Sequence, residues 1–359
     1  MVSRRQFLGN IGLGGLCFVG CSLLAPRASH AQGRRIVKVA GKRVKVIDVH
    51  AHAAVGEALA LAGLKLGEGA LRPDLAVPAT IDQRIAAMDA QGIDMEALSI
   101  NAFWYGKERD LAAKICELQN ERLAEVCAKH PERFVAFATV ALQFPELAAE
   151  QLEQAVKKYH LRGAAVGGSC AGKEISDPIF QPFWAKAEAL GVPVFLHPQP
   201  TGAPTELKQR FAGNGYLDNV IGNPLETTIA LAHLIFEGVF DRFPDLRVCG
   251  AHGGGFLPSY KGRFDQGCVA FPANCKGTIK KKPSEYLNQC YFDSMVFTSE
   301  GLRHLVAEYG ADHIVMGTDY PFPWTTTSVD HILNTPGLSD TDKAAMLGGN
   351  LMRLLGIPG

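Results

Sequence analysis

The chain of 359 residues has no excess of charge of either sign, because 36 Lys and Arg balance 36 Asp and Glu. Nucleic acids and anionic membrane surfaces are bound by basic proteins, so neither is expected as its main partner. No internal repeat or low-complexity tract is present. The composition is that of a globular protein, 47% hydrophobic and 20% charged, and the length suits one large α/β barrel or two smaller domains.

Cysteine metal motifs are also missing. Nine cysteines occur, but none forms a CxxC pair and none lies near a pair of histidines. Most are interpreted as small buried hydrophobic residues, as in Val248-Cys249-Gly250. Cys268 and Cys275 are close enough in sequence to pair, although nothing in the sequence requires it.

No apolar run is long enough for a comfortable membrane span. The run at 11–24 is short and rich in glycine, and it follows the twin arginines Arg4 and Arg5. Residues 1–31 are therefore predicted to be a twin-arginine signal peptide that engages the export machinery and leads an already folded protein to the periplasm. The alternatives are an uncleaved anchor and lipidation at Cys21.

After the leader, apolar strand-like runs alternate with helical stretches, which indicates a buried parallel sheet. The strands are expected near 44–52, 95–100, 134–140, 163–167, 193–197, 247–251, 290–293 and 313–318. The helices are expected near 80–92, 109–129, 146–159, 178–190, 225–241, 299–309 and 340–354. Eight such units over residues 42–357 predict an α/β fold of the (β/α)8 TIM-barrel type. A doubly wound sheet is the alternative, but no glycine-rich nucleotide turn follows the first strand.

One connection is unusually long. Residues 53–79 are predicted to be a lid or substrate loop, and Thr80 is expected to cap the helix that follows it.

Histidines and a carboxylate recur where predicted strands end. His50 and His52 are two residues apart and so face the same side of the first strand. His197, His252 and Asp319 end the fifth, sixth and eighth strands, so a barrel would bring all five groups to one rim. Imidazole nitrogen and carboxylate oxygen suit a divalent metal such as zinc, whereas two structural histidines are the alternative for the first pair alone.

The residues around these positions resemble a known family. The motifs are Asp48-Val49-His50-Ala51-His52, Phe195-Leu196-His197-Pro198, His252-Gly253-Gly254-Gly255 and Gly317-Thr318-Asp319-Tyr320-Pro321-Phe322-Pro323. They are similar to those of the amidohydrolase superfamily, in its branch of aminocarboxymuconate-semialdehyde decarboxylase-like enzymes. The likeness extends through 84–94, 283–286 and 292–294.

The resemblance implies roles for the residues at the rim. His50, His52, His197 and Asp319 would bind one divalent metal, usually zinc, with manganese or cobalt as alternatives, and water as a further ligand. His252 would act as the acid/base residue. Such a site leaves the metal a net positive charge, which lowers the pKa of its water. Asp48 would either support the ligands or point away from the lumen.

The resemblance also implies a substrate and a partner. Arg72 matches a carboxylate-binding arginine, Arg263 an arginine that enters from the neighbouring subunit of a homodimer, and Phe322 an aromatic pocket wall. An exposed surface role is the alternative for each arginine, and packing of its own loop for Phe322. The expected substrate is therefore a small carboxylate.

The sequence as a whole predicts an exported metal-dependent decarboxylase of a small unsaturated or aromatic carboxylic acid. Hydrolysis of a lactone or related carboxylate-bearing ester by the same metal-bound water is the alternative, because it would use the same residues. A binding protein without catalysis is disfavoured, since every ligand and the acid/base histidine are present. The exact substrate stays open, because the family's basic residues are missing before Arg72, where Glu68 stands.

Overall fold

The computed structural model describes residues 33–358, except for residue 70 and residues 200–208. The predicted leader, residues 1–31, and the possible lipidation site Cys21 lie outside the described residues. The fold is therefore that of the unit Arg34–Gly359. Within the described ranges, none of the helices combines the length and the apolar character needed to cross a membrane.

Eight parallel strands lie at the centre of the fold. They are β3 (Ile47–His52), β4 (Met95–Ser99), β5 (Phe134–Ala136), β6 (Ala164–Val166), β9 (Val194–Leu196), β10 (Val248–Gly250), β11 (Cys290–Asp293) and β12 (Ile314–Val315). Regular pairing gives two sheets, of order β3-β4-β5 and β6-β9-β10-β11-β12. Parallel bridges join them at both sides, between Ala138 and Ala164 and between Ala51 and Tyr320. The strands thus close on themselves, and the predicted (β/α)8 barrel is confirmed.

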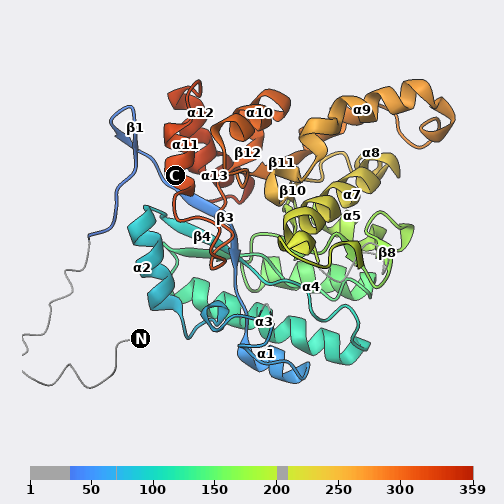
Figure 1. Cartoon of the computed structure of the whole chain (residues 1–359). Helices are drawn as coiled ribbons and strands as arrows, with labels where there is room; N and C mark the ends of the chain where they lie inside the picture. The colour runs from blue at the N-terminus through green and yellow to red at the C-terminus, as the bar shows by residue number, and fades with distance from the viewer. Residues whose placement is uncertain (1–32, 70, 200–208, 359) are drawn as a thin grey trace, which may run out of the picture. The chain divides into compact units, whose positions relative to one another are not determined.

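Helices surround the strands in Figure 1. They are α1 (Gly56–Leu61), α2 (Ile81–Gln91), α3 (Arg109–Lys129), α4 (Pro145–Lys157), α5 (Gln181–Ala189), α7 (Asn223–Phe236), α8 (Val239–Arg242), α9 (Leu257–Ala270), α10 (Ser299–Tyr309), α11 (Ser328–Asn334), α12 (Asp340–Ala344) and α13 (Asn350–Leu354). Two short antiparallel hairpins lie outside the barrel: β1 (Lys38–Val39) with β2 (Lys42–Arg43), and β7 (Ser169–Cys170) with β8 (Lys173–Glu174).

Some local expectations were wrong. The segment 53–79 is not one irregular loop, because it contains α1 and the short 3-10 helix Pro73–Leu75. The Thr80 side chain does not cap α2, since its hydroxyl donates to the Ala76 carbonyl at 2.7 Å. Helix α9 had not been predicted, because its exposed course leaves no apolar stripe in the sequence.

Two layers of apolar side chains hold the barrel together. The larger one packs the outer faces of the strands against the helices. The smaller one takes members from strands all around the barrel, including Val49, Ala97, Phe195 and Val315, and therefore fills the lumen. Phe195 packs edge-on against the ring of His50 with centroids 5.2 Å apart, so the lumen core supports the first of the histidines.

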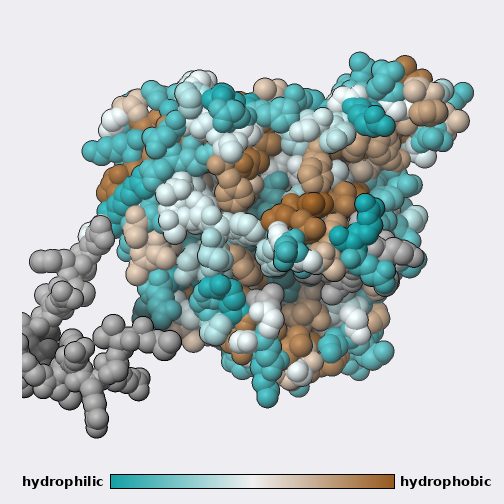
Figure 2. Space-filling view, in the orientation of Figure 1, coloured by the Kyte–Doolittle hydropathy of each residue, from teal (hydrophilic) through white to brown (hydrophobic). Residues whose placement is uncertain are grey.

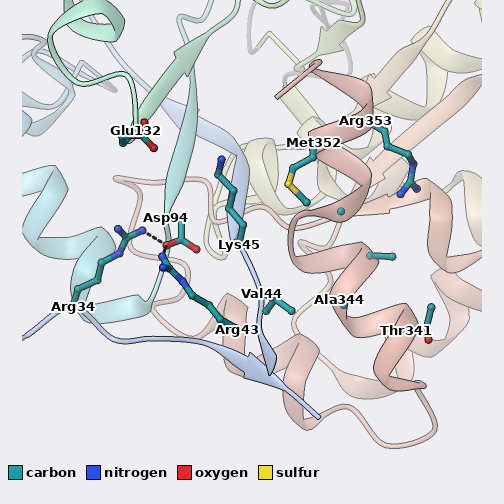
Figure 3. Close-up of a pocket in the computed structure, with 12 residues that line it drawn as sticks. Arg34, Arg43, Val44, Lys45, Asp94, Glu132, Thr341, Ala344, Met352 and Arg353 are labelled. Atoms are coloured by element: carbon teal, nitrogen blue, oxygen red, sulfur yellow. Dashed lines mark hydrogen bonds and ion pairs between the residues drawn. The ribbon is translucent and has the colours of Figure 1, made fainter. Parts of the chain in front are cut away.

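A hollow of about 700 Å³ lies at the amino ends of the strands (Figure 3). Residues from before β3 and from around α13 line it, among them Arg43, Lys45 and Arg353. Asp94 accepts hydrogen bonds from Arg34, from Arg43 at 3.2 Å and from the Val46 amide at 2.7 Å. These ion pairs fasten the first described residues to the barrel.

Candidate metal centre

The four predicted metal ligands meet at the carboxyl ends of three strands. His50 and His52 belong to β3, His197 follows β9, and Asp319 follows β12. One ligand atom from each lies within 4.8 Å of all the others, and all four side chains are buried. Residues more than 250 positions apart in the sequence are thereby brought into one cluster.

Two of the three histidine rings are oriented by hydrogen bonds on their outer side, whereas Nδ1 of His52 has no hydrogen-bond partner among the described residues. Nδ1 of His50 donates to Oδ2 of Asp293 at 2.7 Å, and Nδ1 of His197 donates to the Pro198 carbonyl at 2.9 Å. Nε2 of His50 and Nε2 of His52 then lie 3.1 Å apart, and both face Oδ1 of Asp319, at 3.2 Å and 2.8 Å. Outer hydrogen bonds that fix the tautomer in this way are typical of metal-binding histidines.

The charges in the cluster also suit a cation. Burial alone would raise the pKa of the Asp319 carboxyl, but His50 and His52 hold it well below its usual range. Burial alone would lower the pKa of His50, but Asp319 and Asp293 raise it to about 10. Burial and the neighbouring imidazoles lower the pKa of His197 well below its usual value. The cluster therefore stabilises one positive charge among converging nitrogen and oxygen donors, and three imidazoles with one carboxylate fit a single divalent metal.

His252 lies beside this cluster. Its ring centroid is 5.2 Å from that of His50 and 5.4 Å from that of His197. Burial, followed by the charge of His50, lowers the pKa of His252 to about 4, so its ring is neutral at neutral pH. Its Nδ1 is buried and has no hydrogen-bond partner in the described part of the chain. A neutral imidazole with a free nitrogen can accept a proton from a molecule bound in front of it.

Asp293 connects His252 to the cluster, and the sequence analysis gave it no role. The same carboxylate that accepts from His50 also accepts from the backbone amides of His252 at 2.9 Å and Gly253 at 2.8 Å. It is fully buried at the end of β11. Its strand-end position, the signal that identified Asp319, could have marked it as a functional residue.

Asp48, for which two interpretations had been left open, supports the cluster from behind. Its carboxylate accepts from the His50 amide at 2.9 Å, from the Thr318 amide at 3.1 Å and from the Thr318 hydroxyl. It therefore ties the first strand to the segment that presents Asp319.

Of the three predicted substrate-binding residues, the structure shows only Phe322 in contact with the metal cluster. Phe322 packs edge-on against the ring of His52 with centroids 5.3 Å apart, so it borders the cluster. Arg72 is paired with Asp74, with Nη2 to Oδ2 at 2.6 Å, on a segment that runs beside Ala54. Arg263 is exposed on α9 and makes no hydrogen bond or ion pair with any described residue.

The chain is similar in sequence to a protein family and to several known enzymes. A protein-family model described as Amidohydrolase matches residues 47–357, which include the whole cluster. A 2-amino-3-carboxymuconate-6-semialdehyde decarboxylase of Dictyostelium discoideum is 32% identical over 280 residues, covering 77% of this chain and 76% of that protein. A gamma-resorcylate decarboxylase of a Polaromonas species is 31% identical over 283 residues, covering 76% and 86%.

Solved structures show the same likeness. A dihydroxybenzoic acid decarboxylase from Polaromonas, with bound manganese and the inhibitor 2-nitroresorcinol, matches with a TM-score of 0.78 and 30% identity, covering 88% of this chain and 97% of that one. A 5-carboxyvanillate decarboxylase from Sphingomonas paucimobilis matches with a TM-score of 0.77 and 25% identity, covering 88% and 100%.

We expect Asp319→Ala to lose its bound metal and its activity together, because the cluster would keep only neutral donors. Elemental analysis of the purified variant measures the metal, and the melting temperature of the metal-free protein tests its fold. His233→Ala, at a half-exposed histidine of α7, is the control and should keep its metal. Full metal content in Asp319→Ala would show that the ligand assignment is wrong.

Proposed function

The chain belongs to the amidohydrolase family, and we propose that it is a metal-dependent decarboxylase of a small aromatic or unsaturated carboxylic acid. The observation that carries the proposal is the buried convergence of His50, His52, His197 and Asp319 with His252 beside them. Relatives that resemble the chain over most of their length are decarboxylases of such acids.

The roles of the residues follow from their placement. His50, His52, His197 and Asp319 would hold the metal, whose positive charge would stabilise negative charge on the oxygens of the substrate. His252 would take up a proton from water and deliver it to the carbon atom that bears the carboxylate. The bond between that carbon and the carboxylate breaks, its electron pair forms the new C–H bond, and carbon dioxide leaves, so each turnover consumes one proton. Zinc is the metal expected from the donor set, and manganese, which is bound in the Polaromonas structure, fits it as well.

Arg72 and Phe322 are assigned to the substrate. Phe322 offers an apolar ring beside His52, against which a flat unsaturated acid can pack. Arg72 already binds a carboxylate, that of Asp74, through two of its nitrogens. A carboxylate of the substrate would take the place of Asp74 in this pairing.

We expect the metal-loaded protein to release carbon dioxide from at least one member of a panel of hydroxybenzoic and unsaturated dicarboxylic acids. A coupled carbon dioxide assay and product mass measure the reaction, and Asp319→Ala protein provides the background rate. Lactones with a carboxylate belong in the same panel. Their ring opening with uptake of water, in the absence of any decarboxylation, would assign hydrolysis to the site instead.

His252→Asn should keep its metal and lose turnover by a factor on the order of a hundred or more, because a proton-transfer residue can be removed without emptying the site. Metal content and kcat are measured on the same preparation. A fully active or metal-free variant would remove His252 from the acid/base role.

A homodimer with a shared active site is part of the proposal. Helix α9 extends away from the barrel in Figure 1, and apolar side chains are exposed near its end in Figure 2. Val269 and Phe271 are 71% and 66% exposed, next to the disulfide between Cys268 and Cys275. Exposed apolar groups of this kind mark contact surfaces, and Arg263 on the same helix would enter the partner's site.

Truncation of Arg72 or Arg263 should weaken carboxylate binding by roughly 2–4 kcal/mol if each makes a desolvated paired contact. Complementation tests the sharing. When Arg263→Ala and His252→Asn subunits exchange, the mixed dimer has one site with both defects and one with neither. Part of the wild-type activity should return. Verified exchange without any recovery would show that Arg263 does not act across an interface.

Export by the twin-arginine route to the periplasm completes the proposal. Its support is the Arg4-Arg5 pair followed by a short apolar run. The disulfide between Cys268 and Cys275 agrees with it, because disulfides persist in oxidising compartments. Lipid attachment at Cys21 is the alternative end point of the same route.

A further inference from the structure

Arg84 of α2 is a charged side chain with no exposure to solvent. Its Nη1 donates to Oε2 of Glu96 at 2.9 Å, and its Nη2 donates to the backbone carbonyl of His52 at 2.5 Å. The plane of its guanidinium lies over the ring of Tyr320, 4.6 Å from the centroid. A buried arginine is costly unless such contacts compensate for the lost water.

Two of the three partners of Arg84, His52 and Tyr320, lie on segments that carry predicted metal ligands. His52 is itself a ligand, and Tyr320 directly follows Asp319, another ligand. The two segments are also joined directly, because the His52 amide donates to the Tyr320 carbonyl at 2.7 Å. Arg84 thus contacts both sides of this junction from the helix layer, without touching the ligand atoms.

We propose that Arg84 is a positioning residue of the metal centre, which fixes the His52 carbonyl and the Tyr320 ring so that His52 and Asp319 converge on the metal. The guanidinium fork suits this task, because it binds two acceptors in fixed directions while its face packs on an aromatic ring. The inference rests on the metal centre proposed above and is independent of the identity of the substrate.

A purely structural role would be different. Glu96 is also buried, and its carboxylate accepts a hydrogen bond from Arg84, so the arginine could be present only to compensate this charge. In that case Arg84 would serve only to compensate negative charge, and removal of the charge on Glu96 would make Arg84 dispensable. The two roles therefore predict different behaviour for a double variant.

The test compares Arg84→Met, the charge-balanced Arg84→Met/Glu96→Gln, and Arg84→Lys, which keeps the cation but not the fork. Each protein is stripped of metal, and its melting temperature is measured. The dissociation constant for Mn²⁺ or Zn²⁺ is then determined by chelator competition, with kcat and KM measured separately. If Arg84→Met does not fold, the metal dissociation constants of the double variant and of Arg84→Lys still test the proposal.

Two matched controls accompany these variants. Glu96→Gln leaves the contact between Arg84 and His52 in place, and it should bind metal like the wild type. Arg133→Met removes an arginine that also donates to backbone carbonyls, those of Ile93 and Asp94, but at the amino end of β4. It too should bind metal normally.

We expect the double variant to regain stability relative to Arg84→Met while its metal dissociation constant stays at least about tenfold above wild type, as for other outer-layer residues of metal sites. Arg84→Lys should show the same weakened binding with stability close to wild type. Wild-type affinity in both would overturn the positioning role. If the wild type itself bound no metal, the proposed centre would fail, which is a distinguishable result.

Discussion

The closure of the barrel between β3 and the end of β12 is the contact on which the metal centre depends. The Asp319 amide donates to the His50 carbonyl at 2.8 Å, and the His52 amide donates to the Tyr320 carbonyl at 2.7 Å. Asp48 secures the same junction through Thr318. Backbone hydrogen bonds, rather than attraction between side chains, therefore set the distance from His50 and His52 to Asp319. These residues cannot move apart unless the pairing between β3 and the segment after β12 is broken.

The barrel separates two kinds of charge. At the amino ends of the strands, Asp94 forms ion pairs with both Arg34 and Arg43 (Figure 3). At the carboxyl ends, the buried charges of Asp319 and Asp293 face imidazoles and lie deep in the fold. The first arrangement fastens the chain, whereas the second keeps nitrogen and oxygen atoms available to a cation.

Much of the fold and the centre could be predicted from the sequence, because both follow from short-range patterns. Helices α3 and α10 have the predicted bounds, and α10 also has clear end signals, the capping Thr298 and the following Gly310. The convergence of the four predicted ligands could be foreseen because each lies at the end of an apolar strand, and parallel strands of a barrel end at one rim. The predicted roles of Arg72 and Arg263 depend on a bound substrate and on a second subunit, which the chain alone does not supply.

Two features could not be predicted from the sequence: the contacts of the buried Arg84 and helix α9. Arg84 lies on the same face of α2 as the buried Ile81 and Met88, so helical spacing places it inward. The sequence does not show what the buried guanidinium contacts, because His52 and Tyr320 come from distant segments. Helix α9 buries only its first residues, so it lacks the periodicity from which helices are recognised.

Asp293 serves the metal ligand His50 through one bond and the backbone of His252 through another. One carboxylate thus orients the ring of His50, a predicted metal ligand, and fixes the backbone of His252, the proposed acid/base residue. A substitution at Asp293 would therefore disturb both groups at once, so neither can be adjusted alone through this residue.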